Sequence, residues 1–300
     1  MKKFAWMAAA VMSVVMLAAC DDGNDGPGGG SSGTYPRRID VEVVSYSPAP
    51  GQFVNVIPEY TSGATYATMC RRAQEALNGG SLVTLGAFGG SITLRLSEPI
   101  YNTPGYPDFQ VLGNAFAGNA EPGIVSVSRD GYTWYNLAGE HYSEGSDLIV
   151  MYVRPADDAT NEHYIRYRLF PGGDGEEIGE GWFARQPQYH SQPYYPQWKE
   201  PQEGGNIDGY VLEGRRLPDN ATWDEARRMY VLEAYEGYAD CYPNDDARSY
   251  LNIDNAVDAN GDRVDLGYIK YVRVTTAVLQ DNGAIGECST EVAGIVKLHD

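Results

Sequence analysis

The chain has 300 residues and a formal net charge of −19, which allows one large domain or two small ones with a buried core. So acidic a surface argues against nucleic-acid binding, because phosphates need basic patches, and against charge-driven adhesion to anionic lipid headgroups. It is compatible with cation binding, with neutral sugars, or with solubility alone. The chain also contains 35 glycines and 23 tyrosines, which favours β structure where helical patterns are scarce.

Residues 1–20 have the pattern of a lipoprotein signal peptide. Two lysines form a basic start, and the apolar run that follows is too short to span a membrane. The Leu-Ala-Ala-Cys sequence that ends at Cys20 resembles the lipobox of lipoprotein signal peptidase, so we expect lipidation at Cys20. An ordinary secretory leader with a chance cysteine is the alternative. The acidic pair Asp21-Asp22 resembles an export signal that places such lipoproteins on the outer face of the outer membrane.

Residues 21–36 are expected to be a flexible tether, because they consist mostly of Gly, Ser and Asp and cannot bury apolar surface. No linker or sustained repeat follows, so we predict a single β-sandwich domain over residues 37–300. A lipid, a tether and a globular body would hold a module clear of the membrane, with the lipid alone supplying the attachment.

A helix is predicted over residues 61–78. Its apolar positions fall at three- and four-residue spacing on one stripe, made of Tyr66, Cys70, Ala73 and Leu77. Thr61 or Ser62 could cap its start, and Gly79-Gly80 ends it. We interpret this helix as a lid over one end of the sandwich, with no chemistry of its own.

Period-two alternation predicts strands elsewhere, because each strand then has one buried and one wet face. A first strand is expected at residues 39–46, and the stretch 86–139 organises the fold with short alternating runs between Gly, Pro and Asp turns. Later strands are expected at residues 148–153, 164–169, 210–217, 229–234 and 269–277. The segment 182–198 is aromatic, rich in proline and too irregular for a strand. These features predict a mainly β fold: an antiparallel β-sandwich, jelly-roll-like and similar to carbohydrate-binding modules, with one short N-terminal helix.

Several motifs carry a resemblance to a known family. They are Gly-Ala-Phe-Gly-Gly-Ser-Ile-Thr (86–93), Asp-Phe-Gln-Val-Leu-Gly-Asn-Ala-Phe (108–116), Glu-Pro-Gly-Ile-Val-Ser-Val-Ser (121–128), Trp-Tyr-Asn-Leu-Ala-Gly (134–139), Tyr-Tyr-Pro-Gln-Trp (194–198), Arg-Leu-Pro-Asp-Asn (216–220), Asp-Asn-Ala-Val-Asp-Ala-Asn-Gly (254–261) and Ser-Thr-Glu-Val (289–292). In order and number they resemble the Bacteroides-type "cell surface protein" lipoproteins, over most of the chain. The resemblance implies a surface-exposed β-sandwich lipoprotein and no particular mechanism.

Cysteines in an exported protein can form disulfides. Apart from Cys20 there are three, and an odd number in an exported protein leaves one thiol unpaired. Cys241 and Cys288 both lie near turns in the C-terminal part, so we predict a disulfide between them. Cys70 falls on the apolar stripe of the predicted helix and is expected to be a buried thiol. The four histidines show no paired ligand spacing and no Cys-x-x-Cys occurs, which argues against zinc.

Structural Ca²⁺ is the predicted cofactor, because hard cations bind oxygen ligands. Four candidate ligands crowd one short stretch: Asp254, Asp258, Asn260 and Asp262. This stretch lacks the closing Glu of an EF-hand, and a polar hairpin turned by its Asn-Gly pair is the alternative. Other carboxylate or amide pairs beside turns are Asn114 with Glu121, and Glu287 with Glu291.

An aromatic binding surface is the second candidate site. Five rings lie in the irregular segment: Trp182, Tyr189, Tyr194, Tyr195 and Trp198. Sugars present apolar C–H faces that stack on aromatic rings, while amides and carboxylates bind their hydroxyls. The same rings could instead cap the open end of the sandwich. Trp134 and Tyr135 fit the strand pattern better and are expected in the core.

No catalytic signature stands out. The sequence contains no nucleophile elbow, phosphate loop or His-Glu-x-x-His motif, and no pair of carboxylates is marked as an acid and a base. We therefore expect a non-catalytic, surface-exposed outer-membrane lipoprotein that captures a glycan for nutrient uptake, with an outer-membrane transporter as its partner. A corrinoid (B12-like) ligand is the alternative, since related surface lipoproteins capture corrinoids. A structural or adhesive surface protein without a small ligand, or a glycoside-active enzyme, are the other possibilities.

Overall fold

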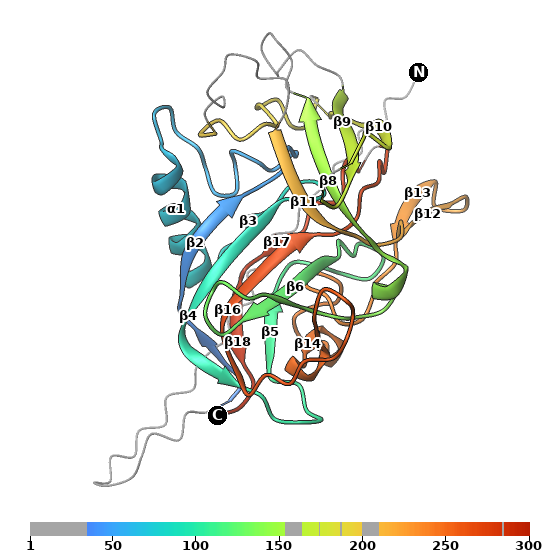
Figure 1. Ribbon diagram of the computed structural model, residues 1–300. Coiled ribbons are helices and arrows are strands. Elements are labelled where there is room, and N and C mark those ends of the chain that lie inside the picture. The colour runs from blue at the N-terminus through green and yellow to red at the C-terminus, as the bar shows by residue number, and fades with distance from the viewer. Residues whose placement is uncertain (1–34, 154–163, 174, 187, 200–209, 284) are drawn as a thin grey trace, which may run out of the picture. The chain divides into compact units, whose positions relative to one another are not determined.

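The computed structural model describes residues 35–153, 164–173, 175–186, 188–199, 210–283 and 285–300 (Figure 1). The predicted signal peptide, Cys20 and the tether up to residue 34 lie outside the described residues. The described part of the chain is mainly β, with several antiparallel sheets and one α-helix, and it belongs to one compact unit, Thr34–Asp300. Its helix is not long and apolar enough to cross a membrane.

The largest sheet has six strands in the order β15-β7-β6-β16-β4-β2, each paired antiparallel with its neighbours (Figure 1). Its strands are β2 (Val41–Ser47), β4 (Ser91–Tyr101), β6 (Gly123–Ser128), β7 (Tyr135–Leu137), β15 (Ala256–Val257) and β16 (Tyr268–Thr276). The stretch 86–139 supplies β4, β6 and β7, as its alternation predicted. The strand between β6 and β4, however, is β16, which comes from near the end of the chain.

A four-stranded sheet in the order β1-β18-β5-β14 forms a second layer. Its strands are β1 (Arg37–Ile39), β5 (Phe109–Leu112), β14 (Tyr250–Leu251) and β18 (Gly294–Lys297), and two further short strands, β3 (Val83–Thr84) and β17 (Glu291–Val292), pair with each other. The single strand predicted at residues 39–46 is therefore two strands. β1 and β2 belong to different sheets, and the chain passes between them at the exposed Asp40.

The two sheets bury one apolar core between them. The six-stranded sheet contributes Ile92, Leu94, Val125, Val127, Val272 and Val274, and the four-stranded sheet contributes Ile39, Phe109, Val111 and Ile295. Apolar side chains from two layers that interdigitate in one cluster define a sandwich. The predicted class, a mainly antiparallel β-sandwich, is confirmed, while the jelly-roll topology stays a prediction.

A third sheet, β10-β9-β8-β11, has its own apolar cluster. Its strands are β8 (Ser146–Val153), β9 (Tyr164–Pro171), β10 (Gly179–Ala184) and β11 (Tyr210–Arg216). The cluster contains Val150, Tyr152, Ile165 and Phe183 from these strands, with Phe88, Tyr194 and Tyr195 from loops. Trp182 lies on β10, so the prediction that the irregular segment begins at residue 182 is wrong.

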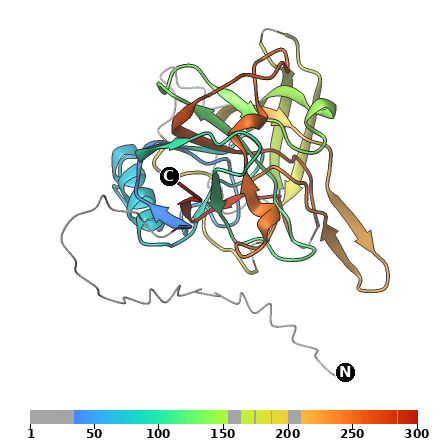
Figure 2. The same ribbon diagram turned by 90° about the horizontal axis from the view of Figure 1, so that it is seen from below.

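Smaller elements complete the described chain. β12 (Ala221–Asp224) and β13 (Met229–Leu232) form a hairpin that projects from its neighbours, seen in orange in Figures 1 and 2. Short 3₁₀ helices occupy η1 (Tyr142–Glu144), η3 (Ala247–Ser249) and η4 (Ile253–Asn255).

The helix α1 (Tyr66–Asn78) begins later than predicted. Thr65 caps it, because its side chain accepts a hydrogen bond from the Thr68 N–H at 3.2 Å, whereas the prediction gave this role to Thr61 or Ser62. The buried side chains of the helix are Met69, Ala73 and Leu77.

α1 packs along β2, the edge strand of the six-stranded sheet. Gln74 Oε1 accepts a hydrogen bond from Val43 N at 3.1 Å. Asn78 accepts one from Val41 N at 2.9 Å and donates to Val41 O at 3.0 Å. Helix side chains thus form hydrogen bonds with backbone groups of the edge strand β2 that would otherwise be free to pair with another strand. The helix that we interpreted as a lid over one end covers this sheet edge.

Truncating a core side chain tests the two-layer packing. Leu94→Ala removes a side chain that is 0% exposed between the sheets, and we expect it to lower the free energy of unfolding by about 3 kcal/mol. The control Val44→Ala changes a side chain on β2 that is 50% exposed and should cost no more than about 0.5 kcal/mol. Chemical denaturation measures both; equal losses would contradict the core assignment.

Candidate functional site

Three carboxylates from distant parts of the chain meet in the interior: Glu121, Asp240 and Glu291. They are 9%, 4% and 2% exposed, and each offers an oxygen within 4.8 Å of the other two. Within the described ranges, this carboxylate cluster is the one group of three or more His, Cys, Asp and Glu side chains close enough to share a metal ion. None of the ion pairs formed by the described residues includes any of the three.

Asp240 connects the segments that form the cluster. Its Oδ1 accepts hydrogen bonds from the N–H groups of Asn114 and Ala115, at 2.9 Å each, and its Oδ2 accepts one from Glu291 N at 2.9 Å. Its carbonyl accepts another from Glu121 N at 2.9 Å. The residue has a φ of 56°, in the left-handed region that Asp tolerates better than most residues. Its side chain and backbone together therefore fix the positions of the other two carboxylates.

Neutral donors hold one oxygen of each glutamate. Glu121 Oε1 accepts a hydrogen bond from Ser289 N at 2.8 Å. Glu291 Oε1 accepts hydrogen bonds from the hydroxyls of Thr84 at 3.1 Å and Ser289 at 3.0 Å. These contacts orient the carboxylates without neutralising their charge.

The amide of Asn114 lies against the cluster. Its Nδ2 is placed to donate to Asp240 Oδ1 at 3.2 Å and to Glu291 Oε2 at 3.3 Å. These contacts add a neutral donor to the site and leave the charge of the carboxylates unchanged.

Burial raises the pKa of each carboxyl group in the cluster, and repulsion by neighbouring carboxylates adds to the shift for the two glutamates. For Glu121 the larger cause is burial, followed by the charges of Glu291 and Asp240; for Glu291 it is burial, followed by the charge of Asp240. Burial raises the pKa of Asp240 to about 6, although backbone N–H groups oppose the shift. The neighbouring Glu287 is buried too, and its pKa rises to about 7. At neutral pH the site therefore favours protons or a bound cation over bare charges.

These raised pKa values make the free energy of unfolding decrease as the pH rises. The folded state holds protons that the unfolded state has released, so stability is full below the unfolded pKa, about 4, and is lost as the pH rises through the folded values. With a chelator present, we expect the free energy of unfolding to fall by about 2 kcal/mol between about pH 5 and pH 8. Denaturation of Glu291→Gln, which removes one charge, should show a shallower slope; an unchanged slope would contradict the account.

The acidic stretch predicted to bind Ca²⁺ folds as polar turns. Asp258 Oδ1 accepts hydrogen bonds from the N–H groups of Asn260 at 2.8 Å and Asp262 at 3.0 Å, and Asp254 accepts one from Gly105 N at 2.6 Å. Hydrogen bonds to backbone N–H groups lower the pKa of both Asp254 and Asp258. The structure does not gather these carboxylates into one metal-binding group. Asp258 is used in its own turn, and Asp254 binds the distant loop at Asn102 and Gly105.

Asn114 and Glu121, by contrast, do lie together at the carboxylate cluster. The sequence pattern pairs Glu291 with Glu287 and gives no signal for Asp240. The left-handed backbone at Asp240 is invisible in a sequence, and the partners are joined only through strand pairing far along the chain.

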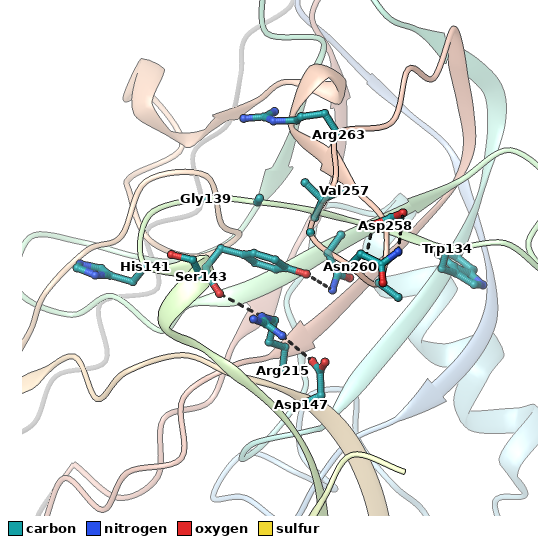
Figure 3. Close-up of a pocket in the computed structure, with 15 residues that line it drawn as sticks. Trp134, Gly139, His141, Ser143, Asp147, Arg215, Val257, Asp258, Asn260 and Arg263 are labelled. Carbon is teal, nitrogen blue, oxygen red and sulfur yellow. Dashed lines mark hydrogen bonds and ion pairs between the residues drawn. The ribbon is translucent and has the colours of Figure 1, made fainter.

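A surface groove of about 750 Å³ is lined by residues of β7, β15, β8 and β11 and their loops (Figure 3). Its polar and aromatic lining includes Trp134, Asn136, Tyr142, Asp147, Arg215, Asp258 and Asn260. Figure 3 shows Asp258 and Asn260 between Trp134 and Arg215 in the view, and an ion pair from Arg215 to Asp147. Two of the predicted Ca²⁺ ligands, Asp258 and Asn260, therefore line this groove.

Neighbouring side chains hold the aromatic rings of the groove. The guanidinium of Arg273 lies 4.1 Å from the Trp134 ring centre, and that of Arg215 lies 4.4 Å from the Tyr142 ring centre. Asn136 Nδ2 donates to the Tyr142 hydroxyl at 2.9 Å, which leaves that hydroxyl able to donate to a ligand. Trp134 is half-buried, so the expectation that it belongs to the core holds only in part.

The arginines of the groove are engaged by the protein. Arg215 donates to the carbonyls of Tyr142 at 3.1 Å and Gly145 at 2.9 Å and to Asp147 at 3.1 Å. Arg263 donates to Asn255 Oδ1 at 2.8 Å, and its guanidinium points away from Asp258 in Figure 3. The groove thus offers hydroxyl, amide and carboxylate groups beside two rings, which suits a neutral ligand with many hydroxyls.

The five predicted binding aromatics do not form one surface. Trp182 and Tyr189 are 50% and 67% exposed, but Tyr194, Tyr195 and Trp198 are only 0%, 2% and 5% exposed. Trp198 packs in the sandwich core, and the two tyrosines pack under the third sheet. These three rings therefore fit the alternative in which the aromatic residues pack against the fold. Trp182 and Tyr189 remain open to solvent.

The predicted disulfide between Cys241 and Cys288 is absent, and both cysteines are free and buried, as Cys70 is free and half-buried. Cys241 and Cys288 belong to one apolar cluster with Tyr235, Tyr238 and Val278, where each acts as a small apolar side chain. Burial raises the pKa of both thiols.

No protein-family model and no curated protein matches the chain. The resemblance to surface lipoproteins therefore stays a prediction, and function must be argued from the fold and the sites.

Proposed function

We propose that this protein is a non-catalytic binding protein, held at the cell surface by a lipid on Cys20, that captures a glycan for uptake through an outer-membrane transporter. The observation that carries the proposal is the groove of about 750 Å³, a volume typical of small-molecule sites. The signal-peptide pattern and the tether support its display outside the cell, and the fold is one on which such sites are commonly built.

The lining of the groove supports a neutral saccharide. Trp134 and Tyr142 offer ring faces for the apolar side of a sugar. Asn260 and Asp258, whose Oδ2 accepts one hydrogen bond from Asn260 Nδ2 at 3.4 Å, offer partners for hydroxyl groups. Because Arg215 is already bound by three protein acceptors, an anionic ligand would find no spare cation there.

A minimal change in the groove tests this proposal. The full chain is applied to a glycan array, in parallel with a corrinoid-binding assay, and the best neutral ligand is titrated. Tyr142→Phe keeps the ring but removes one hydroxyl, and we expect it to weaken binding about fivefold. The control Tyr132→Phe alters a ring that is 90% exposed outside the groove and should leave affinity unchanged.

The competing proposal is a structural or adhesive surface protein without a small ligand, and the burial of Tyr194, Tyr195 and Trp198 favours it. Absence of binding to every glycan and to corrinoids would move the assignment to that class. Binding of a corrinoid alone would replace the glycan as ligand.

We also propose that Ca²⁺ binds at the carboxylate cluster in a structural role. Glu121, Asp240 and Glu291 supply the oxygen donors that Ca²⁺ prefers. A bound divalent cation would offset the repulsion that raises their pKa values and would stabilise the fold by mass action.

Calcium titration of the chelated full chain checks this second proposal. We expect millimolar Ca²⁺ to raise the melting temperature by about 5 °C near neutral pH, and Glu291→Gln to abolish most of that rise. Asp262→Asn, in the exposed turn, is the matched control and should keep it. A melting temperature indifferent to Ca²⁺ in the unaltered chain would rule the site out.

A further inference from the structure

The sheet β10-β9-β8-β11 has one buried face and one open face. Ile165 and Phe183 point into the apolar cluster and are 0% and 2% exposed. Their neighbours along the strands, Tyr164 and Trp182, are 43% and 50% exposed. Since successive side chains alternate between faces, Tyr164 and Trp182 lie together on the open face.

The two exposed rings form a defined pair. Tyr164 and Trp182 have centroids 4.5 Å apart with planes at 62°, an edge-to-face arrangement that fixes both rings relative to each other. Rings that pack together yet keep about half of their surface in water provide a rigid apolar platform with a low entropy cost for binding.

An arginine stands directly beside this platform. Arg166 is the ladder partner of Trp182 across β9 and β10, so their side chains leave the same face at neighbouring positions. Arg166 is exposed, and in the part of the chain that the structure describes it has no ion pair. Arg168, two residues on, is instead paired with Glu177 and lies 5.5 Å from the Phe170 ring centre. Among the described residues of the open face, Arg166 therefore places a guanidinium without an ion pair next to two rings.

We propose that Tyr164, Arg166 and Trp182 form a second binding site, for a sugar that carries a single carboxylate. The apolar face of the sugar ring would stack on Trp182 and Tyr164, and the carboxylate would accept two parallel hydrogen bonds from the planar guanidinium of Arg166. The ligand class differs from that of the groove, where the arginines are committed to protein partners.

The charge of the whole chain selects a small anion over a polyanion. A net charge of −19 repels a long polyanion at every point of approach, whereas one carboxylate at contact with Arg166 feels mainly its nearest charge, because salt screens the rest beyond about 8 Å. A nucleic acid or a heavily sulfated chain is therefore disfavoured. The inference shares with the proposed function the premise that the protein binds saccharides, but it does not depend on the groove.

A pair of probes that differ only in charge tests the site. Methyl β-D-glucuronide and its methyl ester have the same ring, and each is titrated into the full chain by ligand-observed NMR. We expect the acid to bind about threefold more tightly than the ester. Arg166→Gln should equalise the two affinities, and Trp182→Ala should weaken both by about fivefold.

Matched controls come from other exposed residues. Arg129→Gln removes an exposed arginine after β6, and Trp223→Ala removes a ring on β12 that is 48% exposed; both should leave the two affinities unchanged. Thermal melting confirms that each variant is folded. If Trp182→Ala does not fold, Tyr164→Ser provides a second variant of the platform.

Several outcomes would overturn the inference. These are no binding of the glucuronide, equal binding of acid and ester by the unaltered chain, or a preference for the acid that survives Arg166→Gln. Tighter binding of a single-stranded oligonucleotide, lost in Arg166→Gln, would assign the surface to polyanions instead. Loss of glucuronide binding in Tyr142→Phe would place the ligand in the groove, and the proposed function would then stand while this inference fails.

Discussion

Both layers of the sandwich depend on pairing with the last part of the chain. β16 lies between β6 and β4 in the six-stranded sheet, and β18 lies between β1 and β5 in the four-stranded sheet. Neither sheet is continuous without these C-terminal strands, so the shared core forms only when residues far apart in sequence have met. Folds dominated by such non-local pairs pay loop-closure entropy first and fold slowly.

The same pairing assembles the carboxylate cluster. Glu291 lies between β16 and β18 in the chain, and its N–H donates to Asp240 while its strand pairs with β3. Glu121 precedes β6 and is tied to Ser289 and Asp240. Closing the sandwich therefore forces three acidic side chains into a site with little solvent. Such burial costs free energy unless protons or a cation reduce the charge, and it links the stability of the fold to the chemistry of its interior.

The sequence predicts the class of fold because local alternation is enough to mark a strand. Ile92 and Leu94, or Val125 and Val127, reveal a buried face without knowledge of the partner strand. Alternation does not say which sheet a strand joins, and so the change of sheet at Asp40 was missed. Burial of aromatic rings is equally hidden: Tyr194 and Trp182 lie in one aromatic stretch of the sequence, but one packs under a sheet and the other faces water.

The site residues could be predicted only where a local sequence pattern marks them. Asn114 and Glu121 were found because both lie beside turns in one stretch of chain, whereas Asp240 joins them through a backbone conformation and contacts that no local pattern encodes. The crowded acids at residues 254–262 looked more like a cation site, yet backbone N–H groups of their own turns already satisfy Asp258. The density of acidic residues in a sequence is thus a weaker predictor of a cation site than the number of acceptor atoms left without hydrogen bonds after folding.

Because α1 covers the edge strand β2, it affects how copies of the protein can associate at high local concentration. The opposite border of the six-stranded sheet is β15, only two residues long, and the β2 border is already bonded to Gln74 and Asn78. Within the described chain, neither border offers a long row of free amides on which a second copy could continue the sheet. Crowded molecules of this protein can therefore touch without polymerising through their largest sheet.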